Sequence, residues 1–231
     1  MPPVALLAGG LATRLYPLTK KMPKALIQVA GEPFIAHQLR LLHREGIRQV
    51  VLCLGFLGEK VRDVVGTGEK FNLDVAYSFD GDKLLGTGGA LKRALPLLGD
   101  HFFVLYGDSY LDVPYAPPHA AFRESGEPAL MTVFRNEGRW DTSNVLFDGS
   151  HVVRYDKRNP SPDMHYIDYG LGLFTRDVIA EWPKEAFDLA EVYAQLAEQG
   201  RLAGFEVSHR FYEIGTPQGL AETDAHLRRS K

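Results

Sequence analysis

The sequence predicts an α/β protein in which a mostly parallel sheet lies between two layers of helices. Short apolar runs without polar alternation are typical of strands buried on both faces, and several occur in the first half of the chain. Segments with helical periodicity separate these runs, and this alternation favours parallel strands joined by right-handed crossovers. The second half carries strand patterns joined by turn signals, so we expect a mixed arrangement there.

The first half repeats a strand–helix order. Its first expected strand, residues 4–8, is an apolar run that ends at Gly9-Gly10. The first expected helix, residues 33–44, places its apolar side chains on one face and ends at Glu45-Gly46. The same criteria predict strands over 49–54, 73–79 and 101–106, and helices over 56–65 and 88–98.

The second half is expected to form a small mixed lobe that packs on the first. Asp148-Gly149-Ser150 is a hairpin signal between two strand patterns. Prolines at positions 114, 117 and 118 are expected to mark the passage between the halves. Strands are predicted over 129–135, 145–148, 151–155 and 167–174, and helices over 188–199 and 219–228.

Length and composition bound the class of protein. The chain has 231 residues, of which 45% are hydrophobic, enough to bury one core, so we expect one domain over residues 1–231. The formal net charge of −3 disfavours a nucleic-acid partner, since such proteins are usually basic. Cys53 is the one cysteine, which excludes an intrachain disulfide and a cysteine-based zinc site. No apolar run approaches the length of a membrane span, so we expect a cytoplasmic protein without a membrane partner.

A glycine pair follows the first expected strand. Paired glycines at this place let backbone N–H groups point into one cavity, and such backbone nests bind phosphate oxygens. Arg14 and Lys24 add positive charge at the carboxyl edge of the sheet, where open α/β sheets bind ligands. The spacing matches neither a P-loop nor a G-x-G-x-x-G fingerprint. The alternative is a tight turn with two solvated basic residues.

Further motifs make a family resemblance specific. Leu7-Ala8-Gly9-Gly10-x-x-Thr13-Arg14-Leu15-x-Pro17-Leu18-Thr19 with Pro23-Lys24 resembles the signature loop of the sugar-1-phosphate nucleotidylyltransferases. The resemblance continues, in the family's order, in Gly31-Glu32-Pro33, Gly86-Thr87-Gly88-Gly89-Ala90, Gly107-Asp108-Ser109, Asp156-Lys157 and Glu213-Ile214-Gly215-Thr216-Pro217. The short chain resembles the heptose-1-phosphate guanylyltransferase and muramate-1-phosphate uridylyltransferase branch.

The resemblance implies a fold and a reaction. The fold is a Rossmann-like three-layer α/β/α sandwich, with residues 1–110 mainly binding the nucleotide and residues 111–215 mainly binding the sugar phosphate. The reaction transfers a nucleotidyl group from an NTP to a sugar 1-phosphate, which gives an NDP-sugar and pyrophosphate. The implied nucleotide-binding residues are Leu7, Ala8, Gly9, Gly10, Leu11, Ala12, Thr13, Asp82, Gly86, Thr87 and Gly88. Asp80 or Asp82 would accept hydrogen bonds from guanine N1 and N2, which favours guanine as the base and a GDP-sugar as the product.

The resemblance also implies a Mg²⁺ site. Asp108 follows the fourth expected strand and matches the family's metal-binding aspartate, although an aspartate here can also cap a turn. Glu213 stands where the family usually has a second aspartate, and its extra methylene requires a backbone adjustment or a bridging water. Thr216 and Pro217 are expected to be the N-cap and first residue of the last helix.

The acceptor side resembles the family less closely. Lys157 matches the family's lysine that binds the sugar phosphate. The residues expected to contact the sugar are Asn144, Asp168, Tyr169 and Gly170, and they can equally be turn and packing residues. The implied catalytic residues are Arg14, Lys24, Asp108 and Lys157, which position phosphates and neutralise their charge. Two alternatives stay open: cytidylyl transfer to a non-sugar phosphate such as phosphocholine, and a catalytically silent nucleotide-binding subunit.

Overall fold

Four parallel strands form the centre of the computed structural model, which describes residues 1–229 and leaves Ser230 and Lys231 outside the description. They are β1 (Val4–Leu7), β4 (Gln49–Leu54), β5 (Asp74–Phe79) and β6 (His101–Tyr106). Their order across the sheet is β6-β1-β4-β5, with Val4 opposite both Val50 and Phe103. The parallel sheet predicted for the first half is confirmed.

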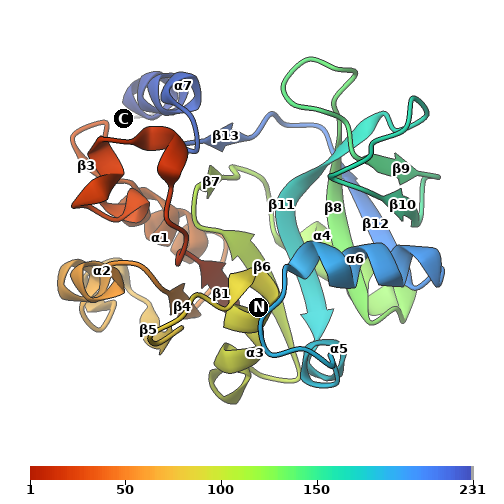
Figure 1. Cartoon of the computed structure of the whole chain (residues 1–231), viewed down its shortest axis with the longest axis horizontal. Helices are drawn as coiled ribbons and strands as arrows, with labels where there is room; N and C mark the ends of the chain where they lie inside the picture. The colour runs from red at the N-terminus through yellow and green to blue at the C-terminus, as the bar shows by residue number, and fades with distance from the viewer. Residues whose placement is uncertain (230–231) are drawn as a thin grey trace.

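The second half continues this sheet through β11 (Tyr166–Thr175), which pairs antiparallel with β6. The remaining strands of the nine-stranded sheet are β8 (Ala129–Arg135), β9 (Val145–Phe147), β10 (Val152–Tyr155) and β12 (Leu202–Val207). In Figure 1 the first half lies at the left of the sheet and these strands lie at the right. The hairpin predicted at Asp148 joins β9 to β10, and the Asp148 carboxylate accepts the backbone N–H groups of Ser150 and His151.

Helices cover both faces of the sheet, which confirms the three-layer prediction. One face packs against α1 (Phe34–Arg44), α2 (Gly58–Val65) and α4 (Ala116–Ser125). The other face packs against α3 (Gly86–Ala94), α5 (Arg176–Ala180) and α6 (Leu189–Glu198). Side chains alternate along β1, so Val4 and Leu6 enter the first apolar cluster and Ala5 enters the second.

The last helix, α7 (Pro217–Arg229), returns across the molecule to the first half (Figure 1). It packs there on the short hairpin of β2 (Gln28–Val29) and β3 (Glu32–Pro33), with Leu227 buried beside Phe34 and Leu41. Just before it, β13 (Tyr212–Glu213) pairs with β7 (Ser109–Tyr110). These contacts bring the end of the chain beside the segment that follows β6.

Several elements differ from the sequence-based expectation. Residues 116–125 form α4, where the proline cluster predicted a connection between the two halves. Prolines are tolerated in the first turn of a helix because the N–H that they lack would have no partner within the helix there. The helix expected over 88–98 begins at Gly86 and tightens into a 3₁₀ turn at Leu95–Leu97. Strand β12 was not predicted. Its sequence, LAGFEV, has a glycine that lowers its strand propensity, and its pairing with β8 depends on tertiary contacts.

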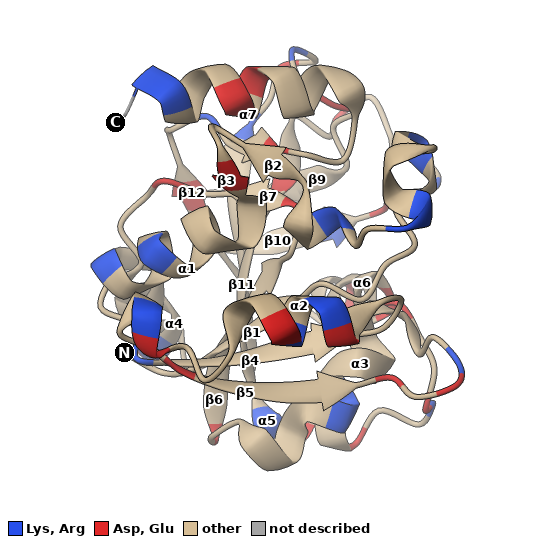
Figure 2. Ribbon diagram, turned by 90° about the vertical axis from the view of Figure 1, so that its left-hand side faces the viewer, with Lys and Arg blue, Asp and Glu red and all other residues tan. Residues whose placement is uncertain are grey.

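Acidic and basic residues are interspersed along the ribbon in Figure 2, with no single basic stripe in that view. Within residues 1–229, none of the helices has the length and apolar character needed to cross a bilayer.

Gly88 allows a close packing that can be tested by substitution. A Cβ at this position would overlap the ring of Phe187, which is 5% exposed. Gly88→Ala should lower the free energy of unfolding by about 1 kcal/mol or more, because overpacking outweighs the gain in helix propensity. Urea denaturation measures this change. Gly99→Ala is the control, because its Cβ would meet no atom closer than 4.0 Å. Equal stability of Gly88→Ala and the wild type would contradict this packing.

Candidate active site

The chain segments that leave β1, β4 and β6 touch one another at the carboxyl edge of the sheet. The N–H of Gly107 donates to the carbonyl oxygen of Leu7 over 2.9 Å, and that of Phe56 donates to Gly9 over 3.2 Å. A Cβ at Gly107 would lie 2.7 Å from the Leu7 oxygen, and one at Gly55 would lie 2.6 Å from the Gly9 oxygen. Only glycine permits the backbones to approach one another this closely.

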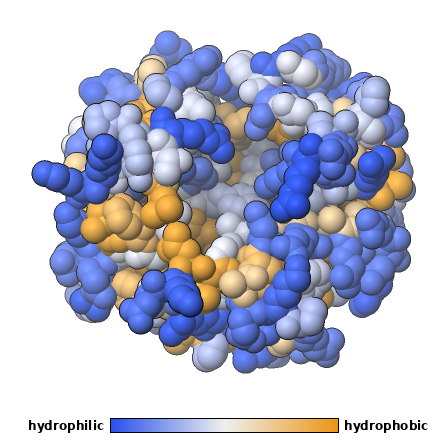
Figure 3. Space-filling view, viewed as in Figure 1, coloured by the Kyte–Doolittle hydropathy of each residue, from blue (hydrophilic) through white to orange (hydrophobic). Residues whose placement is uncertain are grey.

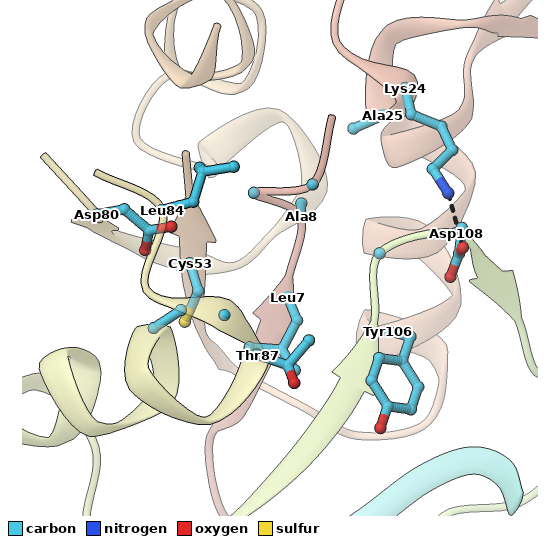
Figure 4. A pocket seen from close by; sticks show the side chains of 15 residues that line it. Leu7, Ala8, Lys24, Ala25, Cys53, Asp80, Leu84, Thr87, Tyr106 and Asp108 are labelled. Atoms are coloured by element: carbon cyan, nitrogen blue, oxygen red, sulfur yellow. Dashed lines mark hydrogen bonds and ion pairs between the residues drawn. The ribbon is translucent and has the colours of Figure 1, made fainter. Parts of the chain in front are cut away.

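A cavity of about 240 Å³ opens above these segments. Figure 4 shows Asp80 on one side of it and the Lys24–Asp108 pair on the other. Six of the residues expected to bind the nucleotide line the cavity: Leu7, Ala8, Gly9, Gly10, Gly86 and Thr87. Leu11, Ala12 and Thr13 lie outside its lining, in a loop that is fastened by a hydrogen bond from the Thr19 hydroxyl to the Ala12 carbonyl oxygen.

Two further residues expected to bind the nucleotide also lie outside the cavity lining. Asp82 is exposed and does not line the cavity, whereas Asp80 lines it and is 6% exposed. Gly88 also lies outside the lining, and its N–H donates to the carbonyl oxygen of Phe187. The small residues at 86–89 therefore make room mainly for residues 185–188, a long-range contact that the sequence does not show.

Lys24 and Asp108 form an ion pair at the mouth of this cavity. The Lys24 Nζ lies 2.7 Å from the Asp108 Oδ2, and their side chains are 21% and 34% exposed. Lys24 begins a 3₁₀ turn after Pro23, and Asp108 lies between β6 and β7. Ion pairs with this degree of exposure contribute little to folding stability. Both side chains are partly exposed and line the cavity.

Glu213 lies beside Asp108 through the pairing of β13 with β7. The N–H of Ile214 donates to the Asp108 carbonyl oxygen over 2.9 Å. The Glu213 carboxylate folds back toward α7, where it accepts the N–H of Gly215 and the Thr216 hydroxyl, the latter over 2.8 Å. A Cβ on Gly219 would overlap it. The extra methylene of glutamate is thus accommodated by a turn of the side chain into space left by glycines.

A second cavity, of about 840 Å³, adjoins the first. Tyr106 and Asp108 line both, so the end of β6 forms the wall between them. Figure 3 shows the surface hollowed between the two halves, with hydrophobic residues along part of its rim. The second cavity is also lined by Arg14, Asn144, Lys157, Asp168, Tyr169, Gly170 and Glu213, all of them expected site residues.

Lys157 and Asp168 meet in the second cavity. The Lys157 Nζ lies 3.8 Å from the Asp168 Oδ2, and the Asp168 side chain is 5% exposed. The other carboxylate oxygen of Asp168 accepts the N–H of Gly170 over 3.0 Å. The side-chain amide oxygen of Asn144 is already engaged, because it accepts a hydrogen bond from the backbone N–H of Asp168 over 3.2 Å.

Sequence reasoning missed Cys53, Tyr106 and Arg210 as cavity residues. Cys53 lies near the carboxyl end of β4, and residues at that end of a parallel strand lie close to the ligand-binding edge of the sheet. Burial raises the pKa of its thiol to about 12, so the thiol stays protonated and is not a nucleophile. Arg210 stacks on Trp140 at 3.7 Å, and neither residue lies in a recognisable motif.

The sequence profile described as "Nucleotidyl transferase" matches residues 4–230. The chain belongs to the nucleotidyl transferase family. The mannose-1-phosphate guanylyltransferase catalytic subunit beta of Drosophila pseudoobscura pseudoobscura is 28% identical over 219 residues, which cover 92% of this chain and 59% of that protein. This chain therefore spans about three-fifths of that relative. The N-acetylmuramate alpha-1-phosphate uridylyltransferase of Caulobacter vibrioides is 28% identical over 96% of this chain and 95% of its own length.

Solved structures share the fold over nearly the whole chain. HddC from Yersinia pseudotuberculosis matches with a TM-score of 0.82 and 24% identity, over 98% of this chain and 100% of that one. A putative glucose-1-phosphate thymidylyltransferase from Bacillus anthracis matches with a TM-score of 0.86 and 23% identity, over 98% and 95% of the two chains.

Thr216 is the N-cap of α7, as predicted, and links that helix to Glu213. Its hydroxyl oxygen accepts the N–H of Gly219 over 3.0 Å while donating to Glu213. Thr216→Ala should lower the free energy of unfolding by about 1–2 kcal/mol, because both bonds are lost. Thermal or urea denaturation tests this. Thr142→Ala, in an exposed loop, should change stability by less than about 0.5 kcal/mol. Equal effects of the two substitutions would contradict the capping role.

Proposed function

We propose that this protein transfers a nucleotidyl group from an NTP to a sugar 1-phosphate and releases pyrophosphate. The observation that carries the proposal is the pair of cavities that share Tyr106 and Asp108. The first has the glycine-rich backbone and a lysine suited to a nucleoside triphosphate, and the second has Lys157 for the acceptor phosphate. Membership of the nucleotidyl transferase family and the named activities of the relatives support the same reaction.

The chemistry requires positioning rather than a general base. The nucleophile is a phosphate oxygen of the sugar 1-phosphate, which is already ionised at neutral pH. It attacks the α-phosphorus in line and forms a new P–O bond to it. The bond between the α-phosphorus and the oxygen bridging to the β-phosphate breaks, and pyrophosphate leaves with the electrons of that bond. Lys157 holds the incoming phosphate, and Lys24 stabilises the negative charge that develops toward the leaving pyrophosphate, while Arg14, which lines the second cavity, adds positive charge from that side.

We propose that Asp108 and Glu213 hold a Mg²⁺ ion. Their carboxylates face the same space, since a Cβ on Gly215 would lie 2.5 Å from the Glu213 Oε2 and 3.4 Å from the Asp108 Oδ2. Within residues 1–229, no three His, Cys, Asp or Glu side chains form a metal-binding group. Two carboxylates suit Mg²⁺, which is commonly completed by substrate phosphates and water. When bound, the ion would neutralise the charge of the phosphate oxygens.

We further propose that the base is guanine, with Asp80 as the residue that recognises it. Its carboxylate lies across the first cavity from the Lys24–Asp108 pair (Figure 4). Its Oδ2 accepts the N–H of Leu85 over 3.3 Å, which orients the group. Guanine offers N–H donors at N1 and N2, which match a carboxylate.

The single buried cysteine supports a reducing, cytoplasmic setting for this reaction.

The proposal is tested by magnesium-dependent pyrophosphate release across a grid of NTPs and acceptors. The acceptors are mannose, glucose, N-acetylglucosamine, N-acetylmuramate and heptose 1-phosphates, with phosphocholine as a non-sugar phosphate. We expect release with GTP and one sugar 1-phosphate. Release only with CTP and phosphocholine, or NTP binding without release for any pair, would overturn the proposed reaction.

Lys24 and Asp108 are expected to be essential for turnover. Lys24→Ala and Asp108→Ala should each lower kcat by about a hundredfold or more, because each removes a preorganised charge from the transition state. Steady-state pyrophosphate release measures the effect. Lys184→Ala and Asp112→Ala remove the same charges from exposed ion pairs away from the cavities and should leave kcat within about twofold. Near-normal turnover of either site variant would remove that residue from the mechanism.

Asp80→Asn tests the choice of base. The amide loses the negative charge that accepts from guanine, so kcat/KM for GTP should fall about tenfold or more. Asp82→Asn is the matched control, since Asp82 is outside the cavity lining, and should leave kcat/KM unchanged. Burial raises the pKa of Asp80, so the GTP preference should weaken on acidification at a higher pH than for an ordinary aspartate. An unchanged kcat/KM for GTP in Asp80→Asn would overturn this assignment.

A further inference from the structure

The ammonium group of Lys157 is surrounded on one side by two aromatic rings and a carboxylate. Its Nζ lies 5.4 Å from the centroid of the Tyr106 ring and 5.6 Å from that of Tyr155. The Asp168 Oδ2 lies 3.8 Å away. Aromatic faces at this distance attract a cation through the ring quadrupole. Because the lysine side chain remains 43% exposed, its other side is open to the second cavity.

The Asp168 carboxylate is fixed by the protein. One oxygen accepts the N–H of Gly170 over 3.0 Å, and the other accepts the Tyr155 hydroxyl over 3.2 Å. Its side chain is only 5% exposed, which leaves little of it for a soluble ligand. Burial and the nearby Asp168 charge raise the pKa of Tyr155, so the phenol stays protonated and keeps donating. The group beside Asp168 that reaches the open cavity is Lys157.

The two rings have rigid supports. Tyr106 is the last residue of β6, at the wall between the two cavities, and Tyr155 is the last residue of β10. Tyr155 is 4% exposed and also packs edge-on against the ring of Tyr193 on α6. A free lysine side chain samples many rotamers, and a contact set of this kind restricts it to few.

On the basis of the proposed function, we propose that Tyr106, Tyr155 and Asp168 form a cage that positions Lys157 for the acceptor phosphate. Asp168 is then a positioning residue that acts through Lys157 and does not itself bind the sugar. The cage holds the ammonium at the wall shared by both cavities, where an acceptor phosphate must lie to reach the nucleotide. The phosphate meets a preorganised cation, and the ordering of the lysine is completed before binding.

A double-mutant cycle separates this role from direct sugar binding. Asp168→Asn should raise the KM for the sugar 1-phosphate about tenfold, with kcat and the KM for GTP within about twofold, because a charged contact to the lysine is lost. In a Lys157→Met background, Asp168→Asn should change the acceptor KM by less than about twofold. Asp177→Asn, an exposed carboxylate on α5, is the control and should change neither KM.

The same factor for Asp168→Asn in both backgrounds would overturn the cage, because the carboxylate would then contact the acceptor directly. No effect of Asp168→Asn on the acceptor KM in the wild-type background would also overturn it.

A second measurement does not depend on turnover or on the folding of Asp168→Asn. Lysines carrying ¹³C-methyl groups are observed by NMR, and the Lys157 signal is assigned by its loss in Lys157→Arg. We expect a ring-current shift of this signal that is retained in Tyr106→Phe and reduced in Tyr106→Leu. A signal at the position of a solvated lysine would overturn the cage. A shifted signal in an enzyme that releases no pyrophosphate would instead overturn the proposed function and leave the cage standing.

Discussion

Three parallel strands, β1, β4 and β6, end at one edge of the sheet, and the backbones that leave them are in direct contact. The contacts at Gly55 and Gly107 tolerate no side chain, and they place the glycine-rich loop directly over the strand ends. The first cavity has this backbone as its floor, so the shape of that floor depends on the close approach. A bulkier residue at either glycine would separate the strand ends and open the floor.

The same edge connects the two cavities. Tyr106 ends β6 and contributes to both, and Asp108 follows it after the one glycine that allows the turn. Lys24, Lys157 and Glu213 reach this point from distant parts of the chain, through a 3₁₀ turn, a loop after β10 and the pairing of β13 with β7. In the proposed reaction, this single strand end thus organises groups for a donor and an acceptor, as a transfer between two phosphates requires.

Glu213 shows how a substitution within a motif is accommodated by its surroundings. The longer side chain turns back onto the first turn of α7, and Gly215 and Gly219 leave the volume that its oxygens occupy. The carboxylate consequently has two roles in the structure: it lies next to Asp108, and it supports the N-cap Thr216. Stability of the last helix and geometry of the proposed ion site are therefore coupled.

The sequence by itself determined the α/β class, the succession of the first four central strands along the chain and the family, because apolar runs, helical periodicity and signature motifs are local patterns. It also predicted as site residues Lys24, Asp108, Lys157 and Glu213, which lie within those motifs and line one or both cavities. Tertiary structure alone decided that Asp80 and not Asp82 faces the first cavity, since Asp80, directly after β5, is buried and Asp82, two residues later, is exposed. It alone decided that Asp168 is enclosed beside Lys157, because that contact joins β11 to the loop after β10. Contacts between segments far apart in the chain depend on how the elements pack, and local sequence patterns do not encode that packing.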